Sequence, residues 1–278
     1  MSLIIREIKV KKALSKSGLP EYDYALNPYL GCQHGCVYCY ARDFTSGEPA
    51  TRWGEVVYVK VNLIEVLSNE VKGVRRGIVG LSTITDPYQP IESKYKLSRG
   101  ALGILCGSGF HVSVQTKSAL VLRDIDLLRQ CGGMVDVGLT ITTMRDVFKL
   151  IEPNTQAPLV RAMTIRKLAR AGVKTWIFLG PIIPGINDSR LDYEPIIRLA
   201  KETNSQLIID RFRPRKTAVG LIKSKLGVNP IPTTDWWRRT ISEANFAAVT
   251  ASTALLRRMS GGVGVGMVQY LITYMTKV

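Results

Sequence analysis

The chain has 278 residues, enough for one large domain or two small ones around a full hydrophobic core. Hydrophobic residues make up 46% of the sequence and charged residues 22%, which excludes a largely disordered protein. With 38 Lys and Arg against 22 Asp and Glu, the formal net charge is +16. Such an excess favours a polyanionic partner, first a nucleic acid and second an acidic membrane surface. The alternative is an ordinary enzyme that is simply basic.

The sequence predicts a cytoplasmic protein with no membrane partner. The uncharged stretch 259–275 contains four glycines, Gln269 and Thr273, and these residues favour a turn and a short buried element over a membrane span. The five cysteines are an odd number, and no secretory signal is evident. We therefore expect a metal site and not a disulfide scaffold.

Strand-like segments rich in Val, Ile, Leu or Thr alternate with helix-like segments along most of the chain. The predicted strands are 22–27, 77–83, 111–115, 135–140, 174–179 and 206–210. The predicted helices are 62–74, 94–109, 122–131, 158–171 and 191–203. This alternation predicts right-handed βαβ units and a parallel sheet. Periodicity alone leaves two arrangements open, a doubly wound sheet or a partly closed barrel, and both place function on the loops after the strands.

Two further expectations concern the edges of this pattern. We expect residues 1–215 to form the core domain and residues 216–278 to form an extension packed on it. In the predicted helix 158–171, Leu159 and Met163 indicate an apolar stripe, with Arg166 and Arg170 on the opposite face.

The loop after the first predicted strand reads NPYLGCQHGCVYCY over 27–40 and holds three cysteines, Cys32, Cys36 and Cys39. Three thiolates from one short loop suit a 4Fe–4S cubane, because each can hold one iron while the fourth iron stays open. Structural zinc is the alternative, but it needs a fourth ligand. His34 is too cramped between the cysteines, and His111 is expected in a strand. The other two cysteines, Cys106 and Cys131, fall in predicted helices, where a buried Cys is a small apolar residue.

The spacing Cys-x3-Cys-x2-Cys, with an aromatic residue just before the last cysteine, resembles the signature of the radical SAM superfamily. The blocks YALNPY at 24–29, TDPYQP at 85–90, TKS at 116–118 and GPIIPGIND at 180–188 resemble its spore photoproduct lyase-related branch, often labelled archaeal DNA repair photolyase-like. The resemblance covers about residues 20–215. It implies an α/β fold, a partial (β/α)6 barrel of the TIM type with a short N-terminal segment and a C-terminal extension.

The resemblance also implies the cofactors, a 4Fe–4S cluster on the three cysteines of the loop and S-adenosylmethionine (SAM) on its open iron. Reduction of the cluster would cleave SAM to methionine and a 5′-deoxyadenosyl radical, which takes a hydrogen atom from the substrate. The family pattern places the following residues around SAM: Tyr38 and Tyr40 beside the adenine, Thr85 and Asp86 at the ammonium, Lys117 at the carboxylate and Thr140 at the ribose. The loop 180–188 would pack against the adenine side.

Each of these roles has a plainer alternative. The two tyrosines are then aromatic filling of the cysteine loop, and Asp86 with Pro87 starts a turn. Spore photoproduct lyase carries a hydrogen-donating cysteine three residues before the aspartate, where this chain has Thr83. Tyr88 is the catalytic candidate for a donor nearby, and a turn aromatic is its alternative.

Basic residues follow the last predicted strand as Arg211, Arg213, Arg215 and Lys216, interleaved with Phe212. Basic residues around an aromatic are typical of a nucleic-acid groove. We therefore expect a radical SAM enzyme that acts on nucleic acid, as a lyase or a repair or modification enzyme, served by an electron donor. The alternatives are a radical SAM enzyme for a protein or small molecule, and a non-catalytic metal-containing nucleic-acid-binding protein.

Overall fold

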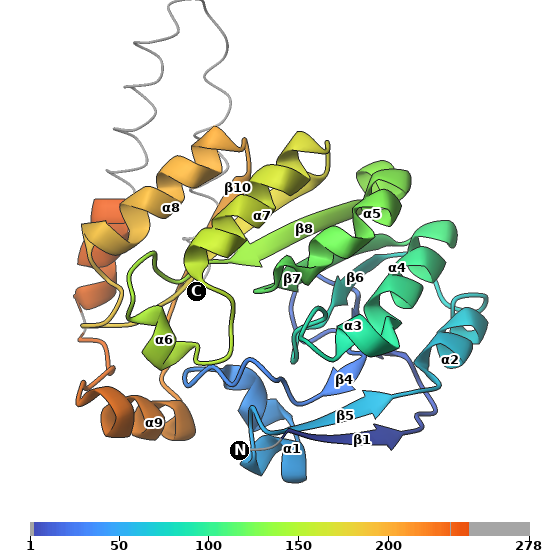
Figure 1. Cartoon of the computed structure of the whole chain (residues 1–278), viewed down its shortest axis with the longest axis horizontal. Helices are drawn as coiled ribbons and strands as arrows, with labels where there is room; N and C mark the ends of the chain where they lie inside the picture. Colours follow the sequence, from blue (N-terminus) through green and yellow to red (C-terminus); the bar gives the residue numbers. More distant parts are fainter. Residues whose placement is uncertain (1–2, 234, 245–278) are drawn as a thin grey trace, which may run out of the picture.

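The computed structural model describes residues 3–233 and 235–244, and a curved seven-stranded sheet forms its centre (Figure 1). The strand order is β10-β9-β8-β7-β6-β3-β2. The strands are β2 (Leu14–Lys16), β3 (Tyr24–Leu26), β6 (Ile78–Leu81), β7 (His111–Thr116), β8 (Val135–Thr140), β9 (Lys174–Ile182) and β10 (Gln206–Arg211). Only β2 pairs antiparallel with its neighbour. The six predicted strands are confirmed, and they are the six parallel ones.

Five helices connect these strands and cover the outer face of the sheet (Figure 1). They are α2 (Leu63–Glu70), α4 (Leu97–Gly107), α5 (Ile125–Cys131), α7 (Pro158–Arg170) and α8 (Arg190–Glu202), as predicted within a few residues. The predicted apolar stripe of α7 is wrong, because Leu159 and Met163 are 60% and 49% exposed. The buried face instead contains Ile165, Leu168 and Arg161. The Arg161 guanidinium pairs with the buried Glu152 carboxylate, so this side of the helix faces the core.

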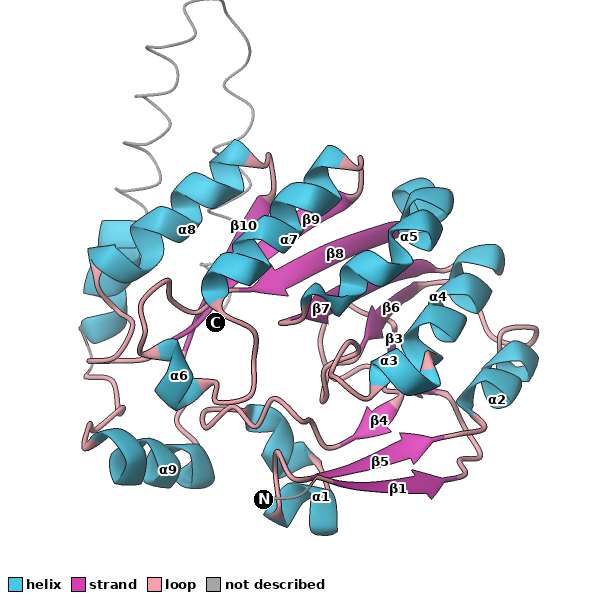
Figure 2. Cartoon of the chain, in the orientation of Figure 1, coloured by secondary structure: helices cyan, strands magenta, loops and turns pink. Residues whose placement is uncertain are grey.

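A second, three-stranded sheet was not expected from the sequence. It consists of β1 (Ile4–Ile8), β5 (Val56–Lys60) and β4 (Tyr29–Leu30), in the order β1-β5-β4. Figure 2 shows these strands as a separate group beside the main sheet. Because β4 ends two residues before the first cysteine of the loop, this sheet fixes where that loop begins.

Further helices lie between and after these elements. The α-helices are α1 (Glu48–Thr51), α3 (Glu92–Tyr95), α6 (Phe148–Ile151) and α9 (Lys216–Leu226), and the 3₁₀ helices are η1 (Tyr40–Phe44), η2 (Ala119–Asp124) and η3 (Gly132–Met134). No helix in residues 3–233 and 235–244 is long and apolar enough to cross a bilayer, and the stretch 259–275 lies outside these residues.

Side chains fill the barrel interior near the N-terminal ends of β7, β8 and β9. A Cβ on Gly138 would lie 2.2 Å from the Trp176 ring, so only glycine leaves room for the indole. The Asp136 carboxylate accepts hydrogen bonds from Trp176 Nε1 and Ser113 Oγ, both at 2.7 Å. His111 Nε2 lies 2.7 Å from the same carboxylate. These side chains occupy the lower part of the barrel, at the end opposite the cysteine loop.

The described part of the extension packs on the core. Ala218 and Ile222 of α9 join an apolar cluster that includes Cys36 and Tyr38 of the cysteine loop. Trp236 is buried in the main core, and its Nε1 donates to Asp188 Oδ2 at 2.8 Å. A domain boundary at residue 215 stays a prediction.

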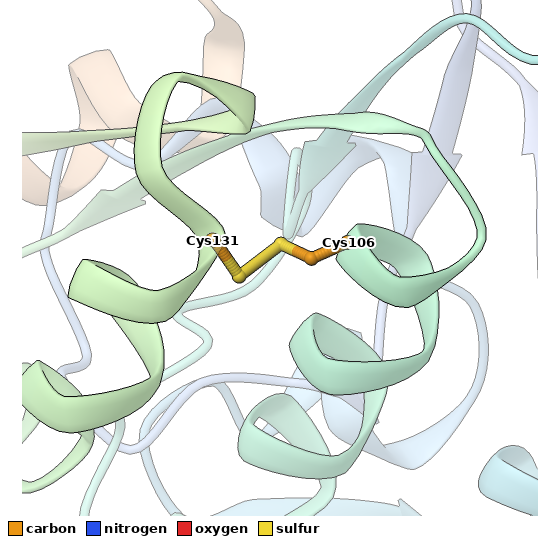
Figure 3. The surroundings of a disulfide bond; sticks show 2 residues. All are labelled: Cys106 and Cys131. Atoms are coloured by element: carbon orange, nitrogen blue, oxygen red, sulfur yellow. A yellow bond between two sulfur atoms is a disulfide. The ribbon is translucent and has the colours of Figure 1, made fainter.

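Cys106 and Cys131 form a disulfide with a Cα–Cα distance of 5.7 Å (Figure 3). Their prediction as separate apolar residues is wrong. Cys106 lies in the last turn of α4, and Cys131 is the last residue of α5. These neighbouring helices flank β7 and end on the same side of the sheet, which brings the two thiols together.

Candidate functional site

The cysteine loop carries three free thiols. Cys32 and Cys36 are buried and Cys39 is half-buried. Gly31, with a φ of +84°, allows the loop to pass β5, because a Cβ there would lie 2.4 Å from the carbonyl oxygen of Val56. Burial raises the pKa of all three thiols, that of Cys36 to about 12, so their thiolates need a cation nearby.

The donor set fits an iron–sulfur cluster better than a single ion. Within the described residues, no three Cys, His, Asp or Glu side chains gather as they would around one metal ion. A cubane does not require this, because each thiolate binds a different iron. The positive irons, bound to the soft thiolates, would also offset the cost of burying these negative charges. In the part of the chain that the structure describes, the zinc alternative finds no fourth ligand beside the three cysteines.

Hydrogen bonds from the loop after β6 hold the cysteine loop in place. Thr85 Oγ1 donates to the Gly31 carbonyl at 2.6 Å, and Gln89 Nε2 donates to the same oxygen at 3.3 Å. The backbone N–H of Gln33 returns a bond to Gln89 Oε1 at 2.9 Å. Thr85 therefore contacts the backbone beside the first cysteine.

Asp86 joins the cysteine loop to β7 through a buried carboxylate. It accepts hydrogen bonds from Thr116 Oγ1 at 2.6 Å, from the Lys117 N–H at 2.8 Å and from the Tyr88 N–H at 2.9 Å. His34 Nδ1 lies 3.2 Å away. Burial alone would raise the pKa of Asp86, but His34 and these hydrogen bonds outweigh it and lower the pKa to about 2. The carboxylate is therefore ionised at neutral pH.

A second buried network fixes Tyr38, and sequence reasoning missed two of its members. The Tyr38 hydroxyl donates to Glu152 Oε1. Arg161 Nη2 donates to Glu152 Oε2 at 2.5 Å, and Arg161 Nη1 donates to the Thr140 carbonyl at 2.9 Å. Glu152 and Arg161 are both fully buried, and Tyr38 is 7% exposed. Tyr38, the residue before Cys39, is thus connected through Glu152 and Arg161 to the end of β8.

Lys117 lies between these two networks. Its Nζ is 5.7 Å from the centre of the Tyr38 ring. Burial lowers the pKa of Lys117, but the opposing effects of Cys36, Glu152 and Cys39 exceed it and raise the pKa overall. A cation is therefore held beside the thiols. Thr140, also buried, accepts a hydrogen bond from Gln115 Nε2 at 3.0 Å.

The two remaining tyrosines face different surroundings. Tyr40 is 45% exposed, and its hydroxyl donates to the Thr83 carbonyl at 2.5 Å, at the end of β6. Tyr88 is fully buried in the main core, with the Arg123 guanidinium 5.9 Å from its ring centre. The role of Tyr88 as a hydrogen donor stays a prediction, and its full burial means that a substrate would have to reach it inside the barrel.

The basic segment follows β10 at the same end of the sheet. Arg213, Arg215 and Lys216 are exposed, and Arg211 is half-buried, 6.0 Å from the Trp237 ring. Some of the positive charge is paired: Arg213 Nη1 lies 2.6 Å from Asp210 Oδ2, and Arg215 Nε lies 3.6 Å from Asp43 Oδ2.

The family model of the radical SAM superfamily matches residues 26–210. The chain belongs to the radical SAM superfamily. It is therefore a radical SAM enzyme, and membership implies a 4Fe–4S cluster and SAM as cofactors. An uncharacterised protein of Methanocaldococcus jannaschii is 37% identical over 186 residues, which are 66% of this chain and 70% of that protein.

Other relatives are matched over a smaller share of their length. An uncharacterised protein of Mycobacterium tuberculosis is 33% identical over 67% of this chain and 58% of its own. The radical SAM Nalpha-GlyT isomerase of Pseudomonas phage M6 is 30% identical over 66% of this chain and 38% of its own.

Solved structures confirm the partial barrel. Spore photoproduct lyase complexed with dinucleoside spore photoproduct has a TM-score of 0.65 at 19% identity, over 83% of this chain and 68% of that one. SuiB of Streptococcus suis, bound to SAM, has a TM-score of 0.53 at 11% identity, over 82% of this chain and 47% of that one. At these identities the likeness concerns the fold.

Proposed function

We propose that this enzyme acts on a nucleic acid, as a lyase or a repair or modification enzyme. The observation that carries the proposal is the exposed basic segment after β10, at the same end of the barrel as the cysteine loop. The net charge of +16 supports it, because Lys and Arg side chains neutralise the phosphates of a nucleic acid. A protein of the same fold was solved with a dinucleoside photoproduct. When bound, the cluster and SAM supply a 5′-deoxyadenosyl radical that removes a hydrogen atom from the substrate.

Three groups of side chains would prepare the cofactors. Cys32, Cys36 and Cys39 hold the cluster. The Lys117 ammonium, kept charged by its neighbours, pairs with the SAM carboxylate. Asp86 stays ionised and so offers a negative charge for the SAM ammonium.

The hydroxyl-bearing residues of the site have less direct roles. Thr85 fixes the loop next to Asp86, Thr140 reaches the ribose, and the exposed Tyr40 lies beside the adenine. Because the Tyr38 hydroxyl is bound to Glu152, we assign Tyr38 the positioning of Cys39 and not an adenine contact. An external electron donor reduces the cluster.

Anaerobic reconstitution tests the enzymatic part. We expect iron and sulfide in the protein, and release of 5′-deoxyadenosine after dithionite is added with SAM. Substrate class is tested by adding cell extract, either untreated or digested with nuclease or protease, and measuring the rate of SAM cleavage. Loss of the stimulation after nuclease supports a nucleic acid. Loss only after protease would overturn the proposal in favour of a protein substrate.

The basic segment has its own test. Binding of DNA or RNA should weaken steeply with salt, because each neutralised phosphate releases counterions. Neutralising Arg213, Arg215 and Lys216 together should flatten the slope of log K against log salt by about 2 to 3. An unchanged slope would remove this segment from the nucleic-acid interface.

A further inference from the structure

Two aromatic side chains are exposed directly after the last cysteine. Phe44 is 57% exposed and Tyr40 is 45% exposed, and both belong to η1. Their ring centres are 6.0 Å apart in an edge-to-face arrangement. Large exposed aromatics in one short segment indicate a binding surface more often than chance exposure.

The position of η1 relates this surface to the top of the barrel. At one end, the Tyr40 hydroxyl donates to the Thr83 carbonyl after β6. At the other end, the Arg215 guanidinium, after β10, lies 4.9 Å from the centre of the Phe44 ring. The aromatic pair therefore spans the loops after β6 and β10, within five residues of Cys39.

The Arg215 guanidinium lies over the Phe44 ring, in cation–π contact with it. Asp43 Oδ2 lies 3.6 Å from Arg215 Nε, so the carboxylate restrains the guanidinium beside the ring. A half-exposed guanidinium on an aromatic face extends the flat surface and adds a positive charge to it. Because Phe44 is 57% exposed, Arg215 and Asp43 leave much of this residue open to solvent.

We propose that Phe44 and Arg215 form a stacking platform for an unpaired base of the nucleic-acid strand, whose phosphates bind the neighbouring Arg213 and Lys216. The inference rests on the proposed function and specifies which surface receives the strand. Proteins that bind single strands combine aromatic rings for the bases with basic residues for the backbone, and this surface provides both. The platform is independent of base identity, because every base has a π-face.

The test measures binding of fluorescently labelled oligo-dT and oligo-rU by anisotropy, with the full chain loaded with its cluster. Phe44→Ala should weaken binding about 5- to 150-fold, the range found for one stacked base. Phe44→Trp should bind at least as well as the wild type. Comparison of the two oligonucleotides separates DNA from RNA.

A matched control removes an exposed apolar side chain elsewhere. Leu191 on α8 is 71% exposed, and Leu191→Ala should leave the affinity unchanged. Salt dependence distinguishes stacking from charge: Phe44→Ala should keep the salt slope of the wild type, whereas Arg213→Gln should reduce it.

Two results separate failure of the platform from failure of the proposed function. If Phe44→Leu binds oligonucleotide as tightly as the wild type, stacking on Phe44 is refuted and nucleic-acid binding stands. If the wild type binds neither oligonucleotide, and nuclease digestion of the extract leaves the stimulation of SAM cleavage intact, the proposed function fails and the platform fails with it. The melting temperature and iron content of each variant are measured alongside, so that a folding defect is recognised.

Discussion

Replacing Arg161 by Met tests the buried network behind the cysteine loop. The side chain is fully buried and donates to Glu152, to the Thr140 carbonyl and to the Gln156 carbonyl. Its removal leaves the Glu152 carboxylate buried without its ion-pair partner, which costs about 3–5 kcal/mol. The loss would take a large part of a total stability of about 5–15 kcal/mol.

Urea unfolding of the anaerobically purified protein measures this cost, and iron analysis measures its effect on the site. We expect Arg161→Met to bind less iron, because Glu152 no longer fixes Tyr38 beside Cys39. The double variant with Glu152→Met should recover most of the stability, since no unpaired charge remains, but not the iron content.

The pH dependence of this stabilisation has a definite sign. Although burial would raise the pKa of Glu152, Arg161 and Lys117 lower it below the ordinary 4.5. The contribution of the ionised Glu152 carboxylate to the free energy of unfolding is therefore fully present above pH 4.5. It is lost as the pH falls through the lowered pKa. A cost for Arg161→Met below about 1 kcal/mol, or a double variant as unstable as the single one, would refute the reasoning.

Three further predictions concern the cysteines. Cys36→Ala should abolish cluster binding and SAM cleavage while Cys106→Ala keeps the cluster, and full iron in Cys36→Ala would overturn the metal assignment. Cys131→Ser opens a disulfide that spans 25 residues, so it should lower the free energy of unfolding by about 3.5 kcal/mol and the melting temperature by about 7 °C. Equal melting temperatures of the wild type with and without reductant would contradict the disulfide. Because Thr83 replaces the donor cysteine and the disulfide has no S–H, the enzyme should not cleanly repair spore photoproduct. Stoichiometric conversion of the dinucleotide without sulfinate or adduct would prove this wrong.

The six parallel strands could be predicted from the sequence because most of them are short segments rich in Val, Ile, Leu or Thr between helix-like segments. In β8, Val135, Val137 and Leu139 are fully buried and alternate with Asp136, Gly138 and Thr140, which is the period-two pattern of a strand. The cysteine motif was equally readable, since its meaning lies in local spacing. The small sheet was missed because β4 has only two residues.

The site networks could not be predicted because their partners are distant in the chain. Tyr38 and Glu152 are 114 residues apart, and no pattern in the sequence pairs them. Arg161 reads as a solvated charge on a helix until its buried partner is known. Tyr88 shows the same limit at short range: it is two residues from Asp86, yet Asp86 contacts the cysteine loop and Tyr88 enters the core.

The side chains that fill the lower end of the barrel have a consequence for the kinetics of turnover. Since Trp176 lies against Gly138 and donates to Asp136, these side chains obstruct that end of the barrel as a route for small molecules. Reactants and products must then share the opening beside the cysteine loop. If the enzyme acts on a nucleic acid, as proposed, SAM would have to enter before the strand, and methionine and 5′-deoxyadenosine would leave after the strand dissociates. Turnover would accordingly follow a compulsory order, and its rate would depend on how fast the polymer is released.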